Sequence, residues 1–182
     1  MNFTLVAPQP RDYTYSKLKS DQVAPARVWG GPGATFMCYR LTGNPLPLTY
    51  RIDADAHLLF VVGTGMITQP ERLQTMRAWM KDPAFTPGLD TFCDFTAAES
   101  TPKLSELREV VATIGEHAPA IGPKKVAILT GKPITFGVAR VFEALAEIED
   151  TPLQVKVFFD RALAWAWLRP GAPQQDYLAR PL

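Results

Sequence analysis

The stretch from Lys124 to Leu168 constrains the fold more than any other part of the sequence. An apolar run at Val126–Leu129 ends at Gly-Lys-Pro, and a helical pattern then covers about residues 135–149. A second strand-like run at 153–159 and a short apolar helix complete the stretch. Strand, helix and strand at this spacing form a βαβ crossover, so the sequence predicts two parallel neighbouring strands.

The preceding residues extend this pattern into one domain that we expect to cover residues 49–168. Two strand-like runs flank a turn at Asp53–His57, which predicts an antiparallel hairpin. Thr68, with Glu71 three residues later, has the form of a capping box and predicts the start of a helix. Further on we predict a short strand at 91–94, a helix over about 103–117 and a loop at 119–123.

The predicted order from Thr49 onwards is β-β-α-β-α-β-α-β-α. It predicts an α/β fold with a mixed, mostly parallel sheet of about five strands and four helices. Residues 1–48 form a Pro/Gly-rich N-terminal arm, which holds six of the 17 prolines and one strand-like run at Ala34–Leu41. We expect the arm to pack on the domain or on a partner subunit, with its strand at the sheet edge, and residues 169–182 to form an irregular tail.

Composition and charge exclude several classes of function. The formal net charge of +1 argues against a nucleic-acid-binding surface. Cys38, Cys93 and the two histidines show no ligand-like spacing, so we predict no metal site, no cofactor and no disulfide. No apolar run is long enough to span a membrane and residues 1–20 lack a signal-peptide pattern, so we expect a cytoplasmic protein without a transmembrane segment.

Short motifs recur in a distinctive order between Tyr50 and Leu168, about two thirds of the chain. They are Tyr50-Arg51-Ile52-Asp53, Gly65-Met66-Ile67-Thr68, Asp82-Pro83-Ala84-Phe85, Asp94, Phe136 to Phe142, and Ala164 to Leu168. In this order the chain resembles the SpoIIAA-like branch of the STAS superfamily, which includes bacterial STAS/SEC14-like domains. The resemblance implies the same α/β fold.

The resemblance also implies a candidate phospho-acceptor. In anti-sigma factor antagonists of this superfamily, a serine behind a strand-ending aspartate accepts a phosphate. Thr96 lies where that serine would follow Asp94, although residues 97–100 do not match the rest of the motif. A phosphate on Thr96 would add negative charge at a helix entrance and change partner binding.

Four polar residues are candidates for binding a ligand or a partner. Asp94 is expected at the carboxyl end of a strand, where α/β sheets bind ligands, or else it closes a local Asx-turn. Thr96 and Ser100 offer hydroxyls near a helix N-terminus, for an anion or for ordinary capping. Arg140 interrupts the apolar face of its helix, and either extends to solvent or pairs with a carboxylate such as Asp94.

The last predicted helix is apolar nearly all round. Leu163 and Trp165 lie about 200° apart on it, so they cannot face the same surface. We expect one side to pack on the sheet and the other to contact the arm or a symmetry mate, which predicts a homodimer. Members of the resembled family usually carry a polar residue in place of Leu163.

These observations predict a non-enzymatic binding or regulatory module that engages a partner protein or a small apolar ligand, because potential catalytic groups are few. The alternative is an enzyme whose cleft lies around Asp94 and Arg140. A deep pocket that joins these two residues would favour the enzyme, and a flat surface there would favour the module.

Overall fold

The computed structural model describes residues 34–36 and 46–171. Six strands in these residues form one sheet in the order β1-β2-β3-β4-β5-β6. Their bounds are β1 Ala34–Phe36, β2 Leu48–Asp53, β3 Leu58–Gly65, β4 Asp90–Ala98, β5 Lys124–Thr130 and β6 Leu153–Phe158. The first three strands pair antiparallel and β3 to β6 run parallel. The predicted mixed, mostly parallel sheet is therefore confirmed, with β5 and β6 as the predicted parallel neighbours.

Five helices occur in the described residues, one more than the sequence predicts. They are α1 Gln69–Met80, α2 Leu104–Glu116, α3 Ala118–Ile121, α4 Pro133–Ile148 and α5 Arg161–Leu168. The additional helix is α3, which replaces the predicted loop. The carbonyl of His117 accepts hydrogen bonds from the amides of Ala120 and Ile121, at 3.0 and 2.9 Å. Gly122 then ends this short helix with a φ of 69°, a conformation that glycine adopts without strain.

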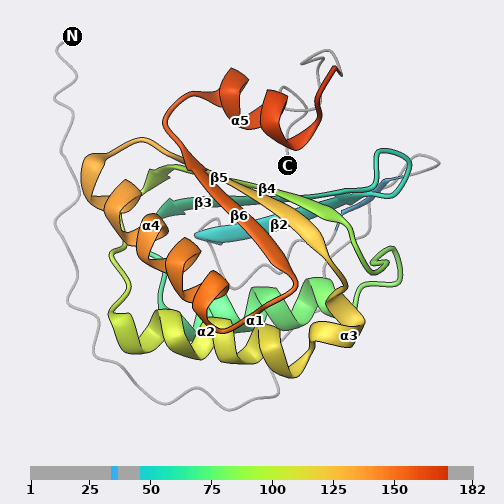
Figure 1. The fold of residues 1–182 in the computed structure, drawn as a ribbon, viewed down its shortest axis with the longest axis horizontal. Coiled ribbons are helices and arrows are strands. Elements are labelled where there is room, and N and C mark those ends of the chain that lie inside the picture. The colour runs from blue at the N-terminus through green and yellow to red at the C-terminus, as the bar shows by residue number, and fades with distance from the viewer. Residues whose placement is uncertain (1–33, 37–45, 172–182) are drawn as a thin grey trace, which may run out of the picture.

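The helices form two layers on opposite faces of the sheet (Figure 1). Each parallel crossover leads to the next strand in the same direction, so right-handed connections place α1, α2 and α4 on one face. The last helix, α5, packs on the other face. Because side chains alternate along a strand, β4 and β5 contribute residues to both layers.

Local sequence signals account for two of the helix starts. The amide of Thr68 donates to the Glu71 carboxylate at 2.8 Å, and the Thr68 side chain caps the Glu71 amide, so the predicted capping box is confirmed. In the same way, Asp160 caps α5 by accepting from the Leu163 amide at 2.9 Å.

Strand β4 is longer than the predicted strand at 91–94 and reaches Ala98. The prediction was too short because β3 continues to Gly65 and supplies partners for the extra residues, Thr64 opposite Ala97 and Gly65 opposite Ala98. The strand-like run at 34–41 contributes β1 to the sheet edge, and its residues 37–41 lie outside the described residues. The rest of the arm before residue 46 and the tail after residue 171 also lie outside them.

Candidate functional site

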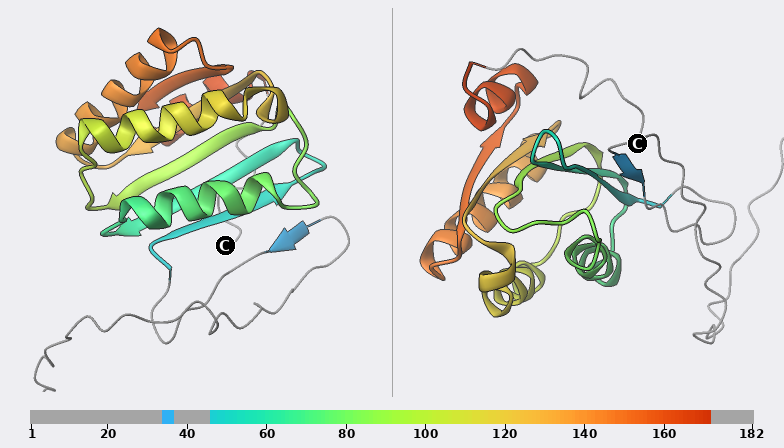
Figure 2. Two further views of the ribbon diagram at one scale, coloured as in Figure 1. Left: turned by 90° about the horizontal axis from the view of Figure 1, so that it is seen from below. Right: turned by 90° about the vertical axis from the view of Figure 1, so that its right-hand side faces the viewer.

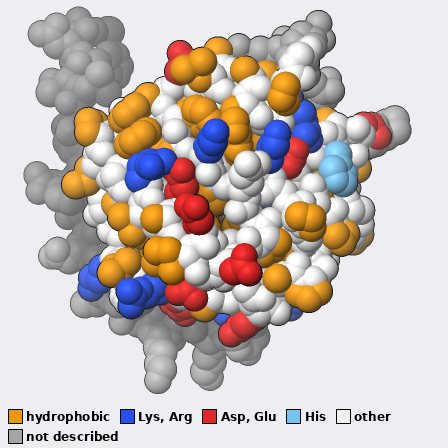
Figure 3. Space-filling model, in the orientation of Figure 1, with side chains coloured by type: hydrophobic (Ala, Val, Ile, Leu, Met, Phe, Trp, Pro, Cys, Tyr) orange, Lys and Arg blue, Asp and Glu red, His pale blue; other side chains and the backbone are white. Residues whose placement is uncertain are grey.

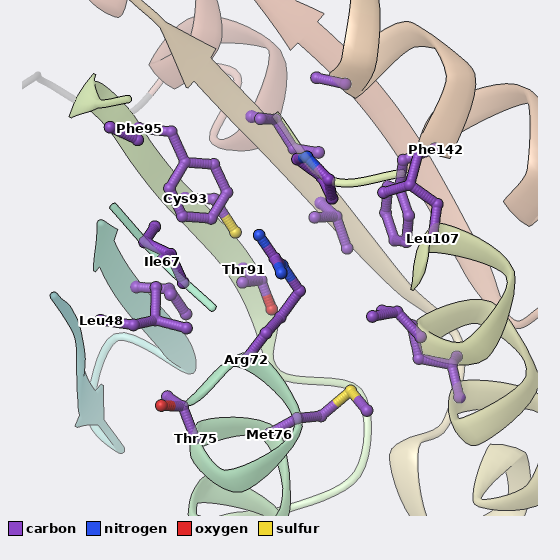
Figure 4. Close-up of a pocket in the computed structure, with 18 of the residues that line it drawn as sticks. Leu48, Ile67, Arg72, Thr75, Met76, Thr91, Cys93, Phe95, Leu107 and Phe142 are labelled. Carbon is purple, nitrogen blue, oxygen red and sulfur yellow. The ribbon is translucent and has the colours of Figure 1, made fainter. Parts of the chain in front are cut away.

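A cavity of about 200 Å³ lies between the sheet and the layer of α1, α2 and α4 (Figure 4). Protein interiors are close-packed and seldom leave voids of this size. In the left view of Figure 2, β4 runs between α1 and α2. On the far side α2 packs against α4 through Leu107, Val111 and Leu145. The cavity occupies the space that α1 and the α2–α4 pair leave over the middle of the sheet.

The walls of this cavity are mainly apolar. The sheet contributes alternate residues of β4 and β5, among them Thr91, Cys93 and Val126, and α4 contributes Val138 and Phe142. Two lining side chains are cationic, Arg72 and Lys124, and no aspartate or glutamate in the described part of the chain lines the cavity. The site therefore combines an apolar interior with positive charge.

Lys124 is the more buried of the two cations, with 8% of its surface exposed. Its ammonium nitrogen lies 4.5 Å from the centre of the Trp79 ring, a cation–π contact. Within the described residues no hydrogen bond or ion pair is formed by this ammonium. Burial lowers the pKa of Lys124 to about 8, and the negative charge of Asp90 opposes this shift only in part.

Arg72 extends from α1 towards Thr91 and Cys93 on β4 (Figure 4). Its guanidinium donates to the side-chain oxygen of Gln69 at 3.1 Å. Burial lowers the pKa of Arg72, while the nearby carboxylates of Glu106 and Glu71 raise it. Arg72 is thus influenced by two carboxylates outside the cavity, and Lys124 by one, Asp90.

The thiol of Cys93 faces the cavity and is only partly buried, because the cavity itself gives access to it. The surrounding apolar groups nevertheless disfavour a thiolate. Burial raises the pKa of Cys93 to about 12, with Lys124 acting in the opposite direction. The side chain is therefore a neutral thiol at physiological pH and a poor nucleophile.

Asp94 lies inside β4, on the α5 face, and not at the carboxyl end of the strand as predicted. One of its oxygens accepts from the Thr96 amide at 3.0 Å and from the Thr96 hydroxyl at 2.6 Å. The other oxygen accepts from the guanidinium of Arg161, the first residue of α5. Asp94 therefore makes the local contact that the sequence offered as the alternative to ligand binding. It also forms an ion pair that holds α5 on the sheet.

A second ion pair, which the sequence did not indicate, holds the other end of α5. Arg169 pairs with Asp90 at the start of β4, and also donates to the carbonyls of Ala56 and His57 at 3.1 and 2.8 Å. The Asp90 carboxylate accepts in addition from the Lys125 amide at 2.8 Å. Both ends of the short helix are thus bound to the same strand.

The structure does not bring Asp94 and Arg140 together. Arg140 is an exposed residue of α4, and its guanidinium pairs with Glu143 at 2.6 Å. Neither Asp94 nor Arg140 lines the cavity, whereas Ser100, another predicted site residue, is buried and does line it. Thr96 is exposed on the α5 side of the molecule.

The two predicted residues of α5 face opposite ways, as their angular separation requires. Trp165 is 3% exposed and packs on Phe92 of the sheet, with ring centres 6.3 Å apart. Leu163 is 64% exposed. On the side of the molecule that Figure 3 shows, with α5 at the upper edge, acidic and basic side chains are interspersed with hydrophobic ones.

No protein-family model matches the chain, and no curated protein matches it. Among solved structures, the chain is similar to an uncharacterised protein of the DUF3478 family from Shewanella loihica, described as having a SpoIIAA-like fold. The two chains share 17% identity with a TM-score of 0.43, over 79% of this chain and 99% of the other. The fold named in that description is also the fold that the resemblance in the sequence implies. None of the described helices has the length and hydrophobicity required to cross a bilayer.

Proposed function

We propose that this chain is a non-enzymatic binding or regulatory module that holds a small apolar ligand in the cavity beneath its sheet. The observation that carries the proposal is the apolar cavity of about 200 Å³ between the sheet and the helices. An empty cavity forfeits dispersion contacts, at roughly 24 cal/mol for each Å³ in measured core substitutions, so its cost here is on the order of several kcal/mol. A ligand of matching shape regains those contacts.

The polar groups of the cavity support binding more than catalysis. Cys93 is a neutral thiol, and neither histidine of the sequence lines the cavity as a general base for it. Asp94 and Arg140, which would have lined the cleft of the alternative enzyme, are paired with Arg161 and Glu143 instead. These pairings support the binding module over the enzyme.

A pair of variants on α4 tests the proposal. Val138 lines the cavity, whereas Val141, three residues later, is 42% exposed. The substitution Val138→Phe fills part of the cavity, and we expect it to weaken binding of the neutral dye 1-aminoanthracene by roughly 10-fold or more, since the dye loses about 1.4 kcal/mol or more of contact. The control Val141→Phe adds the same ring at the surface and should bind the dye like the natural protein. Equal dye affinity in both folded variants would contradict the proposal.

We also propose a homodimer formed through the exposed side of α5. The 64% exposure of Leu163 on this side of the helix supports it, because exposed apolar surface can mark a contact with another protein chain. Sedimentation equilibrium should give a dimer for the natural chain and a monomer for Leu163→Glu. A monomeric natural chain at high concentration would contradict this association.

Phosphorylation of Thr96 stays a prediction from the family resemblance. Its exposed hydroxyl is compatible with modification, although it donates to Asp94 at 2.6 Å. A phosphate would place two negative groups side by side and would compete with Asp94 for Arg161. Mass spectrometry of protein isolated from its native cells would detect the modified residue.

A further inference from the structure

We infer that the ligand of this cavity is an amphipathic monoanion, an apolar chain that ends in a carboxylate, and that the ammonium of Lys124 binds its charged end. The inference rests on the proposed function, because it names the class of ligand for the same cavity. It starts from the charge of the cavity walls, which comprises two cations and, among the described lining residues, no anion.

The Lys124 side chain is buried, with 8% of its surface exposed. A charged group taken from water into an apolar interior is costly unless a counter-charge or hydrogen bonds replace the lost hydration. The Trp79 ring, 4.5 Å from the ammonium, replaces only a small part of that hydration. A carboxylate inside the cavity would supply both the negative charge and the hydrogen-bond acceptors that this ammonium lacks.

The other charged groups near the cavity do not pair with the Lys124 ammonium. Asp90 is the carboxylate whose charge acts on Lys124, yet it lies on the opposite side of the sheet in an ion pair with Arg169. Arg72 is influenced by Glu71 and Glu106 from outside the cavity. Of the two cations that line the cavity, Lys124 is therefore the one whose charge nearby carboxylates neutralise less.

The shape and chemistry of the cavity indicate the rest of the ligand. Its volume of about 200 Å³ suits a medium-length chain, and its mainly apolar walls suit a tail without polar groups. A carboxylate is a compact head group, and its single charge matches the one ammonium among the described residues that line the cavity. Saturated decanoate is a suitable probe, with decanol as the same chain without the charge.

Adjacent lysines provide a matched control. Lys124 faces the helix layer, whereas Lys125 faces α5, with its ammonium 5.5 Å from the centre of the Trp167 ring. Competition with 1-aminoanthracene should show that Lys124→Met weakens decanoate binding by roughly 10- to 100-fold, the loss expected for a charge-assisted hydrogen bond. Decanol should bind both forms within about 3-fold of each other, and Lys125→Met should bind decanoate like the natural protein.

The pH dependence provides an independent readout. Decanoate binding by the natural protein should weaken as the pH rises above about 8, because the Lys124 ammonium loses its proton. The other titratable groups that act on this lysine or line the cavity are Asp90, Cys93 and Arg72, and Arg72 is influenced in turn by Glu71 and Glu106. The Lys124→Met variant should lose the dependence and Lys125→Met should keep it, which assigns it to Lys124 and not to these groups.

The outcomes separate this inference from the proposed function. If decanoate and decanol bind equally well and Lys124→Met changes neither, the inference is wrong while the apolar cavity keeps its proposed role. If neither compound displaces the dye and Val138→Phe leaves dye binding unchanged, the proposed function itself is wrong. Thermal unfolding of each variant shows whether it is folded before binding is compared.

Discussion

The two faces of the sheet differ in whether their charged side chains have a partner of opposite charge. On the α5 face, both aspartates of β4 are ion-paired, Asp90 with Arg169 and Asp94 with Arg161. On the helix face, Lys124 has a Trp79 ring beside it but no carboxylate partner in the described part of the chain. The paired charges are explained by the attachment of α5, whereas the fold alone gives no reason for the unpaired lysine.

The two faces also differ in how completely they are filled. One helix of eight residues closes the α5 face, where Phe60, Phe92 and Trp165 form a chain of aromatic contacts with ring centres 6.3 Å apart. Three longer helices cover the other face and still leave a cavity. At its centre β4 presents Thr91 and Cys93, which are smaller than Phe92 on the opposite side. The volume of the facing side chains, and not the number of covering helices, decides whether a cavity remains.

The largest effect on stability is expected from Trp165, the α5 side chain that packs on the sheet. Trp165→Ala removes a side chain that is 3% exposed, and should lower the free energy of unfolding by about 3–5 kcal/mol, since it leaves a void against Phe92. Leu163→Ala on the same helix is the control. At a protein concentration low enough to keep the chain monomeric, it should lower the free energy of unfolding by less than about 0.5 kcal/mol, because Leu163 is exposed. Urea unfolding measures both, and similar losses would contradict the assigned orientation of α5.

The next effect concerns the unpaired lysine. The pKa of Lys124 is about 8 in the fold against 10.5 for an ordinary lysine, so the unfolded chain binds more protons between these values. Lys124 should therefore contribute roughly 3 kcal/mol of added stability as the pH increases from 8 to 10.5, and this gain is absent below pH 8. Above pH 9 the raised pKa of Cys93 acts in the opposite direction, so the contribution of Lys124 is read from the difference between the natural protein and a Lys124 variant.

The variant Lys124→Met should lack the Lys124 contribution and, at pH 7, should be more stable than the natural protein by up to about 3 kcal/mol. Lys125→Met, on the other face, should retain this contribution. Chemical unfolding at a series of pH values measures these differences. A Lys124→Met variant that is less stable than the natural protein at pH 7 would show that the lysine has a partner in the fold.

The smallest effects are expected from the paired charges, because their side chains remain partly exposed and water screens them. Asp90→Asn should cost about 1–2 kcal/mol, and Asp94→Asn about 1 kcal/mol, since the partner of Asp90 is the less exposed arginine. Arg140→Gln breaks an exposed pair and should cost less than about 0.5 kcal/mol. If Arg140→Gln proves as costly as Asp90→Asn, pairing on the α5 face has no special role.

Local patterns in the sequence determined much of the fold. The start of α1 follows from the capping box at Thr68 and Glu71, and the parallel pairing of β5 and β6 follows from the βαβ pattern after Lys124. Both depend on residues close together in the chain, so the sequence predicts them. The alternation of side chains along β5 also indicates one residue of the cavity, Lys124. Lys124 has the same parity as Val126 and Ile128, so a core-facing strand places the lysine on its buried side.

Only the tertiary structure decided which distant residues meet. Asp94 pairs with Arg161, 67 positions away, and not with Arg140, because α5 crosses the strand face on which Asp94 lies. The length of β4 depended on how far β3 continues beside it. The cavity depended on the summed volumes of side chains from several elements, including Arg72 of α1 and Val138 of α4. Periodicity records the direction of each side chain, but it contains no information about the space that separate elements leave between them.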